Sequence, residues 1–329
     1  MSQLILTTVG GDLGDAVSLG ETPDLSPGLD DVLVEVEAAP VNNADLLFAA
    51  GYFAVYPQLP QPLGAEGVGR VVRAGGATGQ ELVGERVLVL PTFVQGTWAD
   101  QVVMPAKNVV RVTARADAEQ LAMLPVNPAT AYALLNEYVE LGRGDWIGVN
   151  MANSAVGQYL IALAKRAGIR TLAVVRREAA AEQVMAFGAD QVVVDGDGLG
   201  DRIAKALDGA QLRLALDGTG DAGQIAALVQ SLEAGGTVVA YSAATGQAPV
   251  VPLPDLLFRG IQLRGYFILN RIRDTPREKL EQVYGELAEL VAQGTLRASV
   301  EAAYPLTEYR AALAHAARSG RSGKVLFNP

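Results

Sequence analysis

Short apolar runs alternate with amphipathic helical patterns through the middle of the chain. Trp146–Val149 is a continuous apolar run of the length of a buried parallel strand. Apolar residues then recur at helical spacing up to Gly168, and glycine commonly follows a helix end. Leu172–Val175 is a second buried strand. Strand, loop, helix and strand within about thirty residues predict a βαβ unit.

The same alternation continues on both sides of this unit, which predicts a doubly wound parallel sheet and an α/β fold. The further strands that we expect are Val192–Val194, Leu212–Leu216, Thr237–Ala240 and Ile261–Tyr266. The helices that we expect around them are Glu119–Met123, Ala129–Tyr138, Ala179–Phe187, Leu199–Leu207 and Gly223–Leu232.

The first third of the chain has a different pattern, with short strands separated by Pro/Gly turns, and it predicts a partly closed β-barrel. Its expected strands are Leu4–Thr8, Val32–Val36, Val68–Val72, Arg86–Leu90 and Gln101–Met104. The C-terminal tail has more elements than a six-stranded sheet needs, namely Arg277–Gln293 and Leu306–Ser319 as helices, and Ala298–Ala302 and Lys324–Phe327 as strands. We therefore expect one domain of residues 1–116 with 267–329, and a second of 117–266.

Composition restricts the partners and the compartment. Half of the residues are hydrophobic and 19% are charged, as in a well-buried globular protein. The net charge of −10 argues against nucleic acid and anionic membrane as main partners. No apolar run reaches the length of a membrane span, and the N-terminus does not have the pattern of a signal peptide. The absence of cysteine excludes disulfides, and we expect a cytoplasmic protein.

The loop between the first strand and helix of the βαβ unit is a candidate phosphate site. Residues Asn150–Gly157 are mostly small, so a ligand can approach their backbone closely. The loop precedes a helix N-terminus, where backbone N–H groups and the helix dipole favour anions. It is the place at which a dinucleotide pyrophosphate would bind.

The end of the second strand indicates which dinucleotide is bound. A protein that prefers NAD places an acid at this position to bind the ribose 2′-hydroxyl. Here Arg176 and Arg177 follow the strand, and the nearest acid, Glu178, comes after them. Two guanidinium groups suit a 2′-phosphate, although a solvated strand end would have the same composition. The cofactor that we predict is NADPH.

Several short motifs, taken together with this domain order, carry a family resemblance over nearly the whole chain. They are Pro40-Val41-Asn42-Asn43-Ala44-Asp45, Gly64-Ala65-Glu66-Gly67, Gly96-Thr97-Trp98, Val126-Asn127-Pro128-Ala129-Thr130-Ala131-Tyr132, Asn153-Ser154-Ala155-Val156-Gly157, Val174-Val175-Arg176 and Ser322-Gly323-Lys324. The chain resembles the medium-chain dehydrogenase/reductase superfamily, and more closely its zinc-free 2-enoyl thioester reductase branch. The resemblance implies a GroES-like barrel domain and a Rossmann domain.

The residues argue against a catalytic metal. Zinc members of the superfamily hold the metal with Cys and His and carry a Gly-His-Glu motif in the first domain. In this chain the motif is Gly64-Ala65-Glu66, cysteine is absent, and the only histidine is His315. Three N or S ligands for zinc cannot be assembled from these residues. We expect packing or surface roles for His315 and a structural role for Glu66.

The resemblance implies hydride transfer from NADPH to the β-carbon of an enoyl thioester or enone, followed by protonation at the α-carbon. The branch uses a tyrosine for this proton, but the matching position here is Phe53. The remaining candidates are Tyr52, Tyr56 and water.

The resemblance also assigns contacts with the cofactor. The matching residues are Asn42, Asn127, Asn153, Ser154, Ala155, Val156, Tyr241, Ser242, Ala243, Ala244, Tyr266, Phe267, Ile268 and Lys324, in addition to Arg176, Arg177 and Glu178.

Three functions stay open. The first is an NADPH-dependent reductase of 2-enoyl-CoA or enoyl-ACP. The second is a reductase of quinones or small enones with the same fold and cofactor. This function is favoured because Phe53 stands where the family has its tyrosine. The third is an NADPH-binding sensor or structural protein with little turnover. Relatives often pair through a sheet edge of the cofactor domain, which implies a homodimer.

Overall fold

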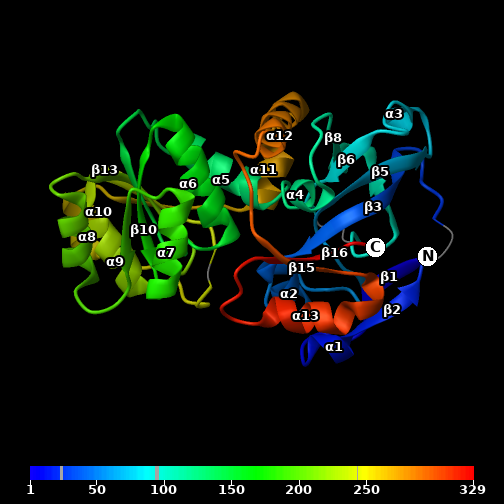
Figure 1. Ribbon diagram of the computed structural model, residues 1–329, viewed down its shortest axis with the longest axis horizontal. Coiled ribbons are helices and arrows are strands. Elements are labelled where there is room, and N and C mark those ends of the chain that lie inside the picture. Colours follow the sequence, from blue (N-terminus) through cyan, green and yellow to red (C-terminus); the bar gives the residue numbers. More distant parts are fainter. Residues whose placement is uncertain (23–24, 93–95, 243) are drawn as a thin grey trace. The chain divides into compact units, whose positions relative to one another are not determined.

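The computed structural model describes residues 1–22, 25–92, 96–242 and 244–329, and Figure 1 shows their helices and strands. The chain forms two compact units, and one consists of Met1–Ala129 with Ile268–Pro329, here called unit 1. The other, Thr130–Phe267, is unit 2. The first boundary therefore follows residue 129 and not residue 116, because helix α4 (Ala118–Ala122) packs on strands of unit 1.

Unit 2 contains the expected doubly wound sheet. Six parallel strands are arranged in the order β11-β10-β9-β12-β13-β14 within the described residues. Their bounds are β9 Trp146–Val149, β10 Arg170–Val175, β11 Gln191–Val194, β12 Leu212–Asp217, β13 Leu232–Ala240 and β14 Gln262–Gly265. The order reverses at β9, so the loops after β9 and β12 meet at a topological switch point.

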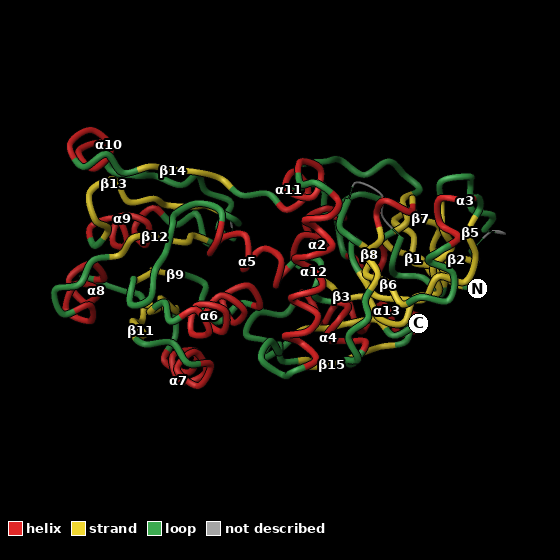
Figure 2. The backbone as a smooth tube through the Cα atoms, turned by 90° about the horizontal axis from the view of Figure 1, so that it is seen from above, coloured by secondary structure: helices red, strands yellow, loops and turns green. Residues whose placement is uncertain are grey.

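Helices cover both faces of this sheet. Their bounds are α5 Asn127–Asn136, α6 Ala155–Ala167, α7 Glu178–Phe187, α8 Leu199–Leu207, α9 Ala222–Gln230 and α10 Leu253–Phe258. Figures 1 and 2 show α6 and α7 on one face, and α8, α9 and α10 on the other. Gly168 and Gly188 end α6 and α7 in the left-handed conformation, with φ of 74° and 102°.

Unit 1 contains the predicted barrel-like strands and the returning tail. One sheet has the order β2-β1-β4, and the other has β15-β16-β3-β5-β6-β8 with β7 paired to β3. The bounds are β1 Ser2–Leu6, β2 Val17–Glu21, β3 Asp31–Val41, β4 Gln61–Pro62, β5 Gly67–Ala74, β6 Arg86–Val89, β7 Gln101–Pro105, β8 Val109–Arg111, β15 Val300–Tyr304 and β16 Lys324–Phe327. Strand β16 pairs antiparallel with β3, with Val325 opposite Val41. This pairing joins the last residues of the chain to the first domain, as predicted.

The helices of unit 1 include several that the hydropathy pattern did not predict. The bounds are α1 Leu13–Ala16, α2 Asn43–Ala49, α3 Ala77–Gln80, α11 Ile268–Asp274, α12 Arg277–Ala292 and α13 Tyr309–Ala317, with 3-10 turns at Ala106–Asn108 and Leu306–Glu308. The expected strand Leu4–Thr8 was wrong by two residues, because β1 pairs with β2 from Ser2 to Leu6. The expected helix Leu306–Ser319 is a 3-10 turn followed by α13.

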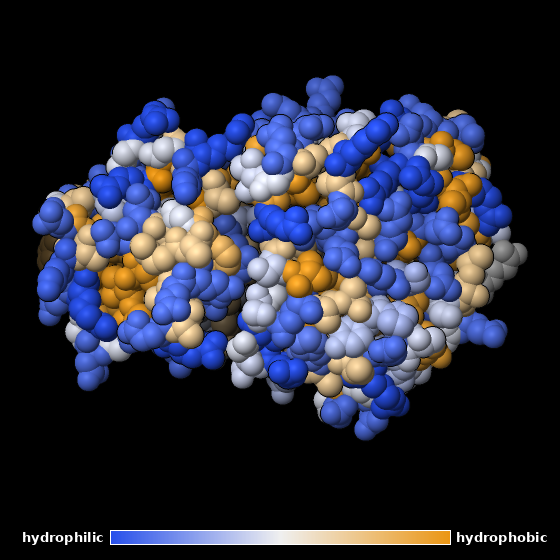
Figure 3. Space-filling view, viewed as in Figure 1, coloured by the Kyte–Doolittle hydropathy of each residue, from blue (hydrophilic) through white to orange (hydrophobic). Residues whose placement is uncertain are grey.

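Each unit has its own hydrophobic core. In unit 1, the rings of Trp98 and Phe327 pack with a tilt of 58° and centroids 5.2 Å apart, among buried valines and leucines. In unit 2, apolar side chains of the central strands pack against α8 and α9. Hydrophilic side chains cover most of the face seen in Figure 3, with apolar patches between them. None of the described helices is long and apolar enough to cross a membrane.

Candidate functional site

The loop before α6 has the geometry of a phosphate site. The Ser154 hydroxyl caps the helix and accepts a hydrogen bond from the Gly157 backbone N–H at 3.2 Å. A Cβ atom on Gly157 would lie 2.3 Å from the Ala152 carbonyl oxygen, so only glycine fits there. The predicted contact residues Asn153, Ser154, Ala155 and Val156 are half-buried and therefore partly accessible. Ser154 is the N-cap of a 13-residue helix that begins at Ala155. The backbone N–H groups of Ala155 and Val156 have no hydrogen-bond acceptor among the described residues, so they are available to an anion.

A buried polar network fixes this loop to its neighbour. The Asn150 amide donates to Asp217 Oδ1 at 2.5 Å and to Thr219 Oγ1 at 2.9 Å, and its Oδ1 accepts from the Gly218 N–H at 2.7 Å. The Asp217 carboxylate also accepts from the Gly220 N–H at 3.0 Å. The network joins the ends of β9 and β12 at the switch point. The hydropathy pattern did not identify it, although polar residues directly after two buried strands were a signal.

The segment after β13 lies at the same edge of the sheet. The Tyr241 N–H donates to the Asp217 carbonyl at 2.9 Å, and the Ala244 N–H donates to the Gly218 carbonyl at 3.3 Å. Burial, and then the charge of Asp217, raises the pKa of the Tyr241 hydroxyl. Ser242 is exposed. The predicted contact Ala243 lies outside the described residues.

Strand β10 ends beside the phosphate loop, and the two predicted arginines follow it. Arg176, Arg177 and Glu178 are exposed, and Glu178 is the first residue of α7. Neither guanidinium group forms an ion pair or hydrogen bond within the described part of the chain. The two positive charges are therefore available to a ligand.

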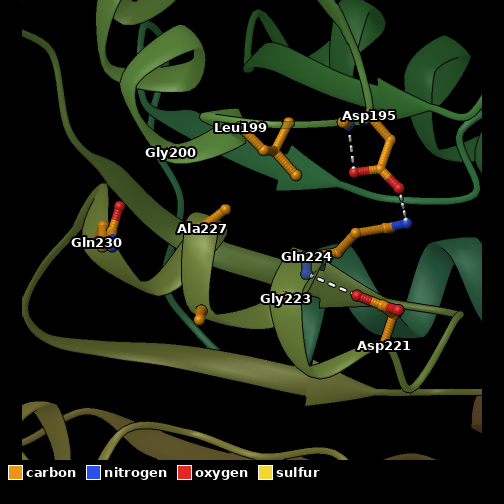
Figure 4. A pocket seen from close by; sticks show the side chains of 10 residues that line it. Asp195, Leu199, Gly200, Asp221, Gly223, Gln224, Ala227 and Gln230 are labelled. Atoms are coloured by element: carbon orange, nitrogen blue, oxygen red, sulfur yellow. Dashed lines mark hydrogen bonds between the residues drawn. The ribbon is translucent and has the colours of Figure 1, made fainter.

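A small pocket lies further along this edge (Figure 4). It has a volume of about 260 Å³, and Asp195 after β11 and Asp221 after β12 contribute to its lining. Gln224 connects the two acids, since its side chain donates to Asp195 at 2.8 Å and its N–H donates to Asp221 at 2.9 Å. The pocket was not predicted.

Tyr266 and Phe267 end unit 2 just after β14. The Tyr266 N–H donates to the Ala240 carbonyl at 2.9 Å, which continues the pairing of β13 and β14. Both residues are half-buried, and Ile268 is buried at the start of α11 in unit 1.

A second group of predicted residues forms a buried polar cluster in unit 1. Asn42 is at its centre: its Nδ2 donates to Glu66 Oε1 at 2.6 Å, and its Oδ1 accepts from the Lys324 ammonium group. The Asn127 amide also approaches Asn42 Oδ1 at 3.4 Å. Glu66 Oε2 accepts from the Val126 N–H at 2.8 Å, as expected of a structural carboxylate. The pairing of β16 with β3 brings Lys324 to Asn42.

Burial dominates the electrostatics of this cluster. It raises the pKa of Asp45 to about 6 and raises the pKa of Glu66, while the nearby charge of Lys324 opposes both shifts. It lowers the pKa of Lys324, against the charges of Glu66 and Asp45. Asp45 also accepts from the Asn42 N–H at 2.8 Å, across the first turn of α2. Two carboxyl groups and one ammonium group thus share a poorly solvated space.

The residues of the cluster do not fit a catalytic zinc ion. Ala65 offers no ligand atom, and both Glu66 oxygens accept hydrogen bonds. Among the described residues, no group of three His, Cys, Asp or Glu side chains could hold a metal ion. His315 is in another place, where Tyr304 and Glu301 contact its two ring nitrogens, each at 2.9 Å.

The predicted proton donors lie on the surface of unit 1. Tyr52 is 82% exposed and Tyr56 is 65% exposed, and neither hydroxyl forms a hydrogen bond within the described residues. Phe53 is half-buried and packs edge-to-face on Phe48, with ring centroids 6.5 Å apart. The structure does not bring Tyr52 or Tyr56 into the Asn42 cluster.

Comparisons with known proteins agree with this architecture. Residues 28–114 match the alcohol dehydrogenase GroES-like domain, and residues 155–289 match the family described as zinc-binding dehydrogenase. The mitochondrial enoyl-[acyl-carrier-protein] reductase of Dictyostelium discoideum is 32% identical over 91% of this chain and 86% of its own length. The same-named protein of Xenopus tropicalis is 32% identical over 87% of this chain and 84% of its own length.

Among solved structures, the Escherichia coli quinone oxidoreductase complexed with NADPH superposes with a TM-score of 0.88 at 22% identity, and all of each chain is covered. At that identity the likeness concerns the fold. The matches to the two domains, together with relatives above 30% identity over most of both chains, establish the family. The chain belongs to the medium-chain dehydrogenase/reductase superfamily, in the family of the enoyl-[acyl-carrier-protein] reductases.

Proposed function

We propose that this protein is an NADPH-dependent reductase of activated carbon–carbon double bonds, and that its preferred acceptors are trans-2-enoyl thioesters of CoA or acyl carrier protein. The observation that carries the proposal is the pair of exposed arginines after β10, beside a capped helix N-terminus, in a member of the enoyl reductase family. When bound, NADPH supplies the hydride for this reaction.

The residues of unit 2 fit this cofactor. The N–H groups of the first turn of α6, with Ser154 and the close approach that Gly157 permits, would bind the pyrophosphate. Arg176 and Arg177 would bind the 2′-phosphate by charge-assisted hydrogen bonds. The predicted neighbours of the nicotinamide in this unit stay Tyr241, Ser242, Ala244, Tyr266 and Phe267.

Unit 1 offers groups that suit an activated carbonyl acceptor. Hydride addition to the β-carbon moves negative charge to the carbonyl oxygen as an enolate. The amides of Asn42 and Asn127 and the ammonium group of Lys324 are hydrogen-bond donors gathered in one place. Without a zinc ligand set, such donors are the means of stabilising that charge. Oxidation of an alcohol is poorly supported, because these residues supply no Lewis acid to stabilise an alkoxide.

A quinone or small enone is the alternative acceptor. Phe53 has no hydroxyl to protonate an α-carbon, and a quinone takes its protons on oxygen, where water can supply them. Tyr52 and Tyr56 stay predicted donors for the enoyl reaction. A sensor or structural protein with little turnover is the third function.

An acceptor screen with purified protein separates these functions. NADPH oxidation is followed with crotonyl-CoA and with a naphthoquinone, each compared with NADH as the donor. We expect crotonyl-CoA to be reduced faster and NADPH to be preferred. Faster naphthoquinone reduction would establish the alternative acceptor, whereas tight NADPH binding without oxidation by any acceptor would establish the sensor.

We also propose that two copies associate through the outer edge of the sheet in unit 2. Figure 2 shows β14 and α10 at this edge. All four residues of β14 are exposed, and α10 exposes Leu253, Leu257 and Phe258 by 63%, 66% and 84%. An exposed strand edge beside large apolar side chains favours pairing with another strand. A cytoplasmic location, with no nucleic acid or membrane as partner, stays a prediction from the sequence.

A further inference from the structure

The enoyl reaction needs a proton at the α-carbon, and the expected tyrosines are poorly placed to give it. Tyr52 and Tyr56 are largely exposed, and the ring of Phe53 is packed against Phe48. A general acid has to be held within hydrogen-bond reach of the reacting atom. Among the described residues, the ionisable groups that form hydrogen bonds with Asn42 are Asp45, Glu66 and Lys324.

Two of these three groups, the carboxylates, already accept hydrogen bonds from the protein. Glu66 is fully buried, and its two oxygens accept hydrogen bonds from Asn42 Nδ2 and the Val126 N–H. Asp45 is 3% exposed and accepts from the Asn42 N–H. Lys324 differs, because its side chain is only half-buried and its ammonium group carries three N–H bonds. Among the described residues only Asn42 Oδ1 accepts one of them.

The position of the ammonium group is fixed from two sides. Glu66 orients the Asn42 amide, so that Asn42 Oδ1 faces Lys324. On the backbone side, the Lys324 N–H donates to the Ser299 carbonyl at 2.8 Å. The turn before it is held by Glu301, whose Oε2 accepts from the N–H groups of Ser322 at 2.6 Å and Gly323 at 3.1 Å. A general acid needs this kind of fixed geometry.

The surroundings also make the ammonium group a better acid. Burial lowers the pKa of Lys324, and the positive charge of Arg321 acts in the same direction. The negative charges of Glu66 and Asp45 oppose this shift. A lysine in free solution holds its proton too tightly to be a useful acid near neutral pH, and partial desolvation reduces this difference.

From this geometry we propose that Lys324 is the general acid of the reaction, and that Asn42 and Glu66 are positioning residues that hold its ammonium group. The inference rests on the proposed enoyl reductase function. Bound NADPH would supply the hydride for the new C–H bond at the β-carbon, with the electrons of the C=C bond moving into the enolate. The enolate then forms the α-carbon C–H bond with a proton from Lys324 Nζ. The resulting neutral amine recovers a proton from solvent.

Two substitutions of Lys324 test this role. Lys324→Met removes the acid, while Lys324→Arg keeps a positive charge and a donor but holds its proton far too tightly to give it up. Single-turnover reduction of crotonyl-CoA is measured at saturating NADPH, with naphthoquinone reduction as the matched reaction that needs no carbon protonation. We expect crotonyl-CoA reduction to fall by about 100-fold or more in both variants. Naphthoquinone reduction should fall by less than about tenfold in Lys324→Arg, because this variant keeps a charged donor for the reduced oxygen.

Equal losses with the two acceptors in Lys324→Arg, or no loss of crotonyl-CoA reduction in either variant, would overturn the proposal. So would a large loss in Tyr52→Phe or Tyr56→Phe with full activity in both Lys324 variants. Melting temperatures and NADPH binding are measured for each variant, and Lys324→Arg keeps the test valid if Lys324→Met does not fold. A wild-type protein that reduces naphthoquinone but no activated alkene also refutes this role of Lys324, and it leaves NADPH-dependent reduction intact. Failure of the proposed function is distinct, because the wild-type protein itself would then reduce no activated alkene, whereas failure of the Lys324 role alone leaves wild-type crotonyl-CoA reduction intact.

Discussion

Arg176 and Arg177 are two exposed positive charges with no partner in the described chain, directly after the last residue of β10. Each charge-assisted hydrogen bond to a 2′-phosphate contributes about 1.5–3 kcal/mol. Replacing both residues by Ala should weaken NADPH binding by about 2–4 kcal/mol, or about 30- to 1,000-fold in Kd, and should affect NADH binding far less. Fluorescence titration with each cofactor measures this. Arg166→Ala, at the opposite end of α6, is the control, and equal losses for both cofactors would refute the phosphate assignment.

Asp45 should make the stability of the protein depend on pH. Its pKa rises from 3.8 to about 6 because it is buried, so the folded state binds more protons than the unfolded state between those values. The free energy of unfolding should therefore fall as the pH rises through this window, by up to roughly 3 kcal/mol. Asp45→Asn keeps an acceptor for the Asn42 N–H but does not titrate. Urea unfolding at pH 4 and pH 6.5 should show a smaller fall in the variant, and an equal fall would contradict this account.

At the scale of single elements, Glu301 of β15 and His315 of α13 hold the turn that precedes β16. The His315 hydrogen bond, followed by those from Ser322 and Gly323, lowers the pKa of Glu301 to about 2, because these donors favour its charged form. Glu301→Gln removes that charge and weakens three contacts with the turn. We expect faster hydrogen exchange in residues 320–324 and slower crotonyl-CoA reduction, through a less ordered Lys324. The control is Glu308→Gln, which changes an exposed acid before α13. Unchanged hydrogen exchange of residues 320–324 in Glu301→Gln would show that other contacts hold the turn.

The elements that the sequence predicts best are those with strong local patterns. Trp146–Val149 and Lys324–Phe327 have the predicted bounds, because continuous apolar runs lie between clear turn residues. Helix α2 was not predicted, although Asn42 and Asp45 at cap spacing were a signal. The Asn42 cluster as such could not be predicted. Its members are far apart in sequence, and only the pairing of β16 with β3 brings Lys324 to Asn42.

At the scale of the whole molecule, the domain order was predictable because the C-terminal elements exceed what one parallel sheet can use. The boundary itself was less predictable. Helix α4 has a helical pattern like those of unit 2, yet it packs on β3 and β5 in unit 1. Local periodicity indicates that a helix forms, whereas long-range packing decides which domain it joins.

The free edge of β14 leads to a prediction about assembly. Pairing two copies along this strand would satisfy its exposed backbone groups and bury Leu257 and Phe258. Each large apolar side chain contributes about 1.5–3 kcal/mol when it is fully buried. Phe258→Glu with Leu257→Glu should therefore convert a dimer into monomers, which sedimentation velocity measures directly. The matched control is Val83→Glu with Leu29→Glu, two exposed apolar residues of unit 1. Because the cofactor loops lie at the carboxyl ends of the strands and not along the edge of β14, the monomeric variant should still bind NADPH. A wild-type protein that sediments as a monomer would refute the edge-to-edge arrangement.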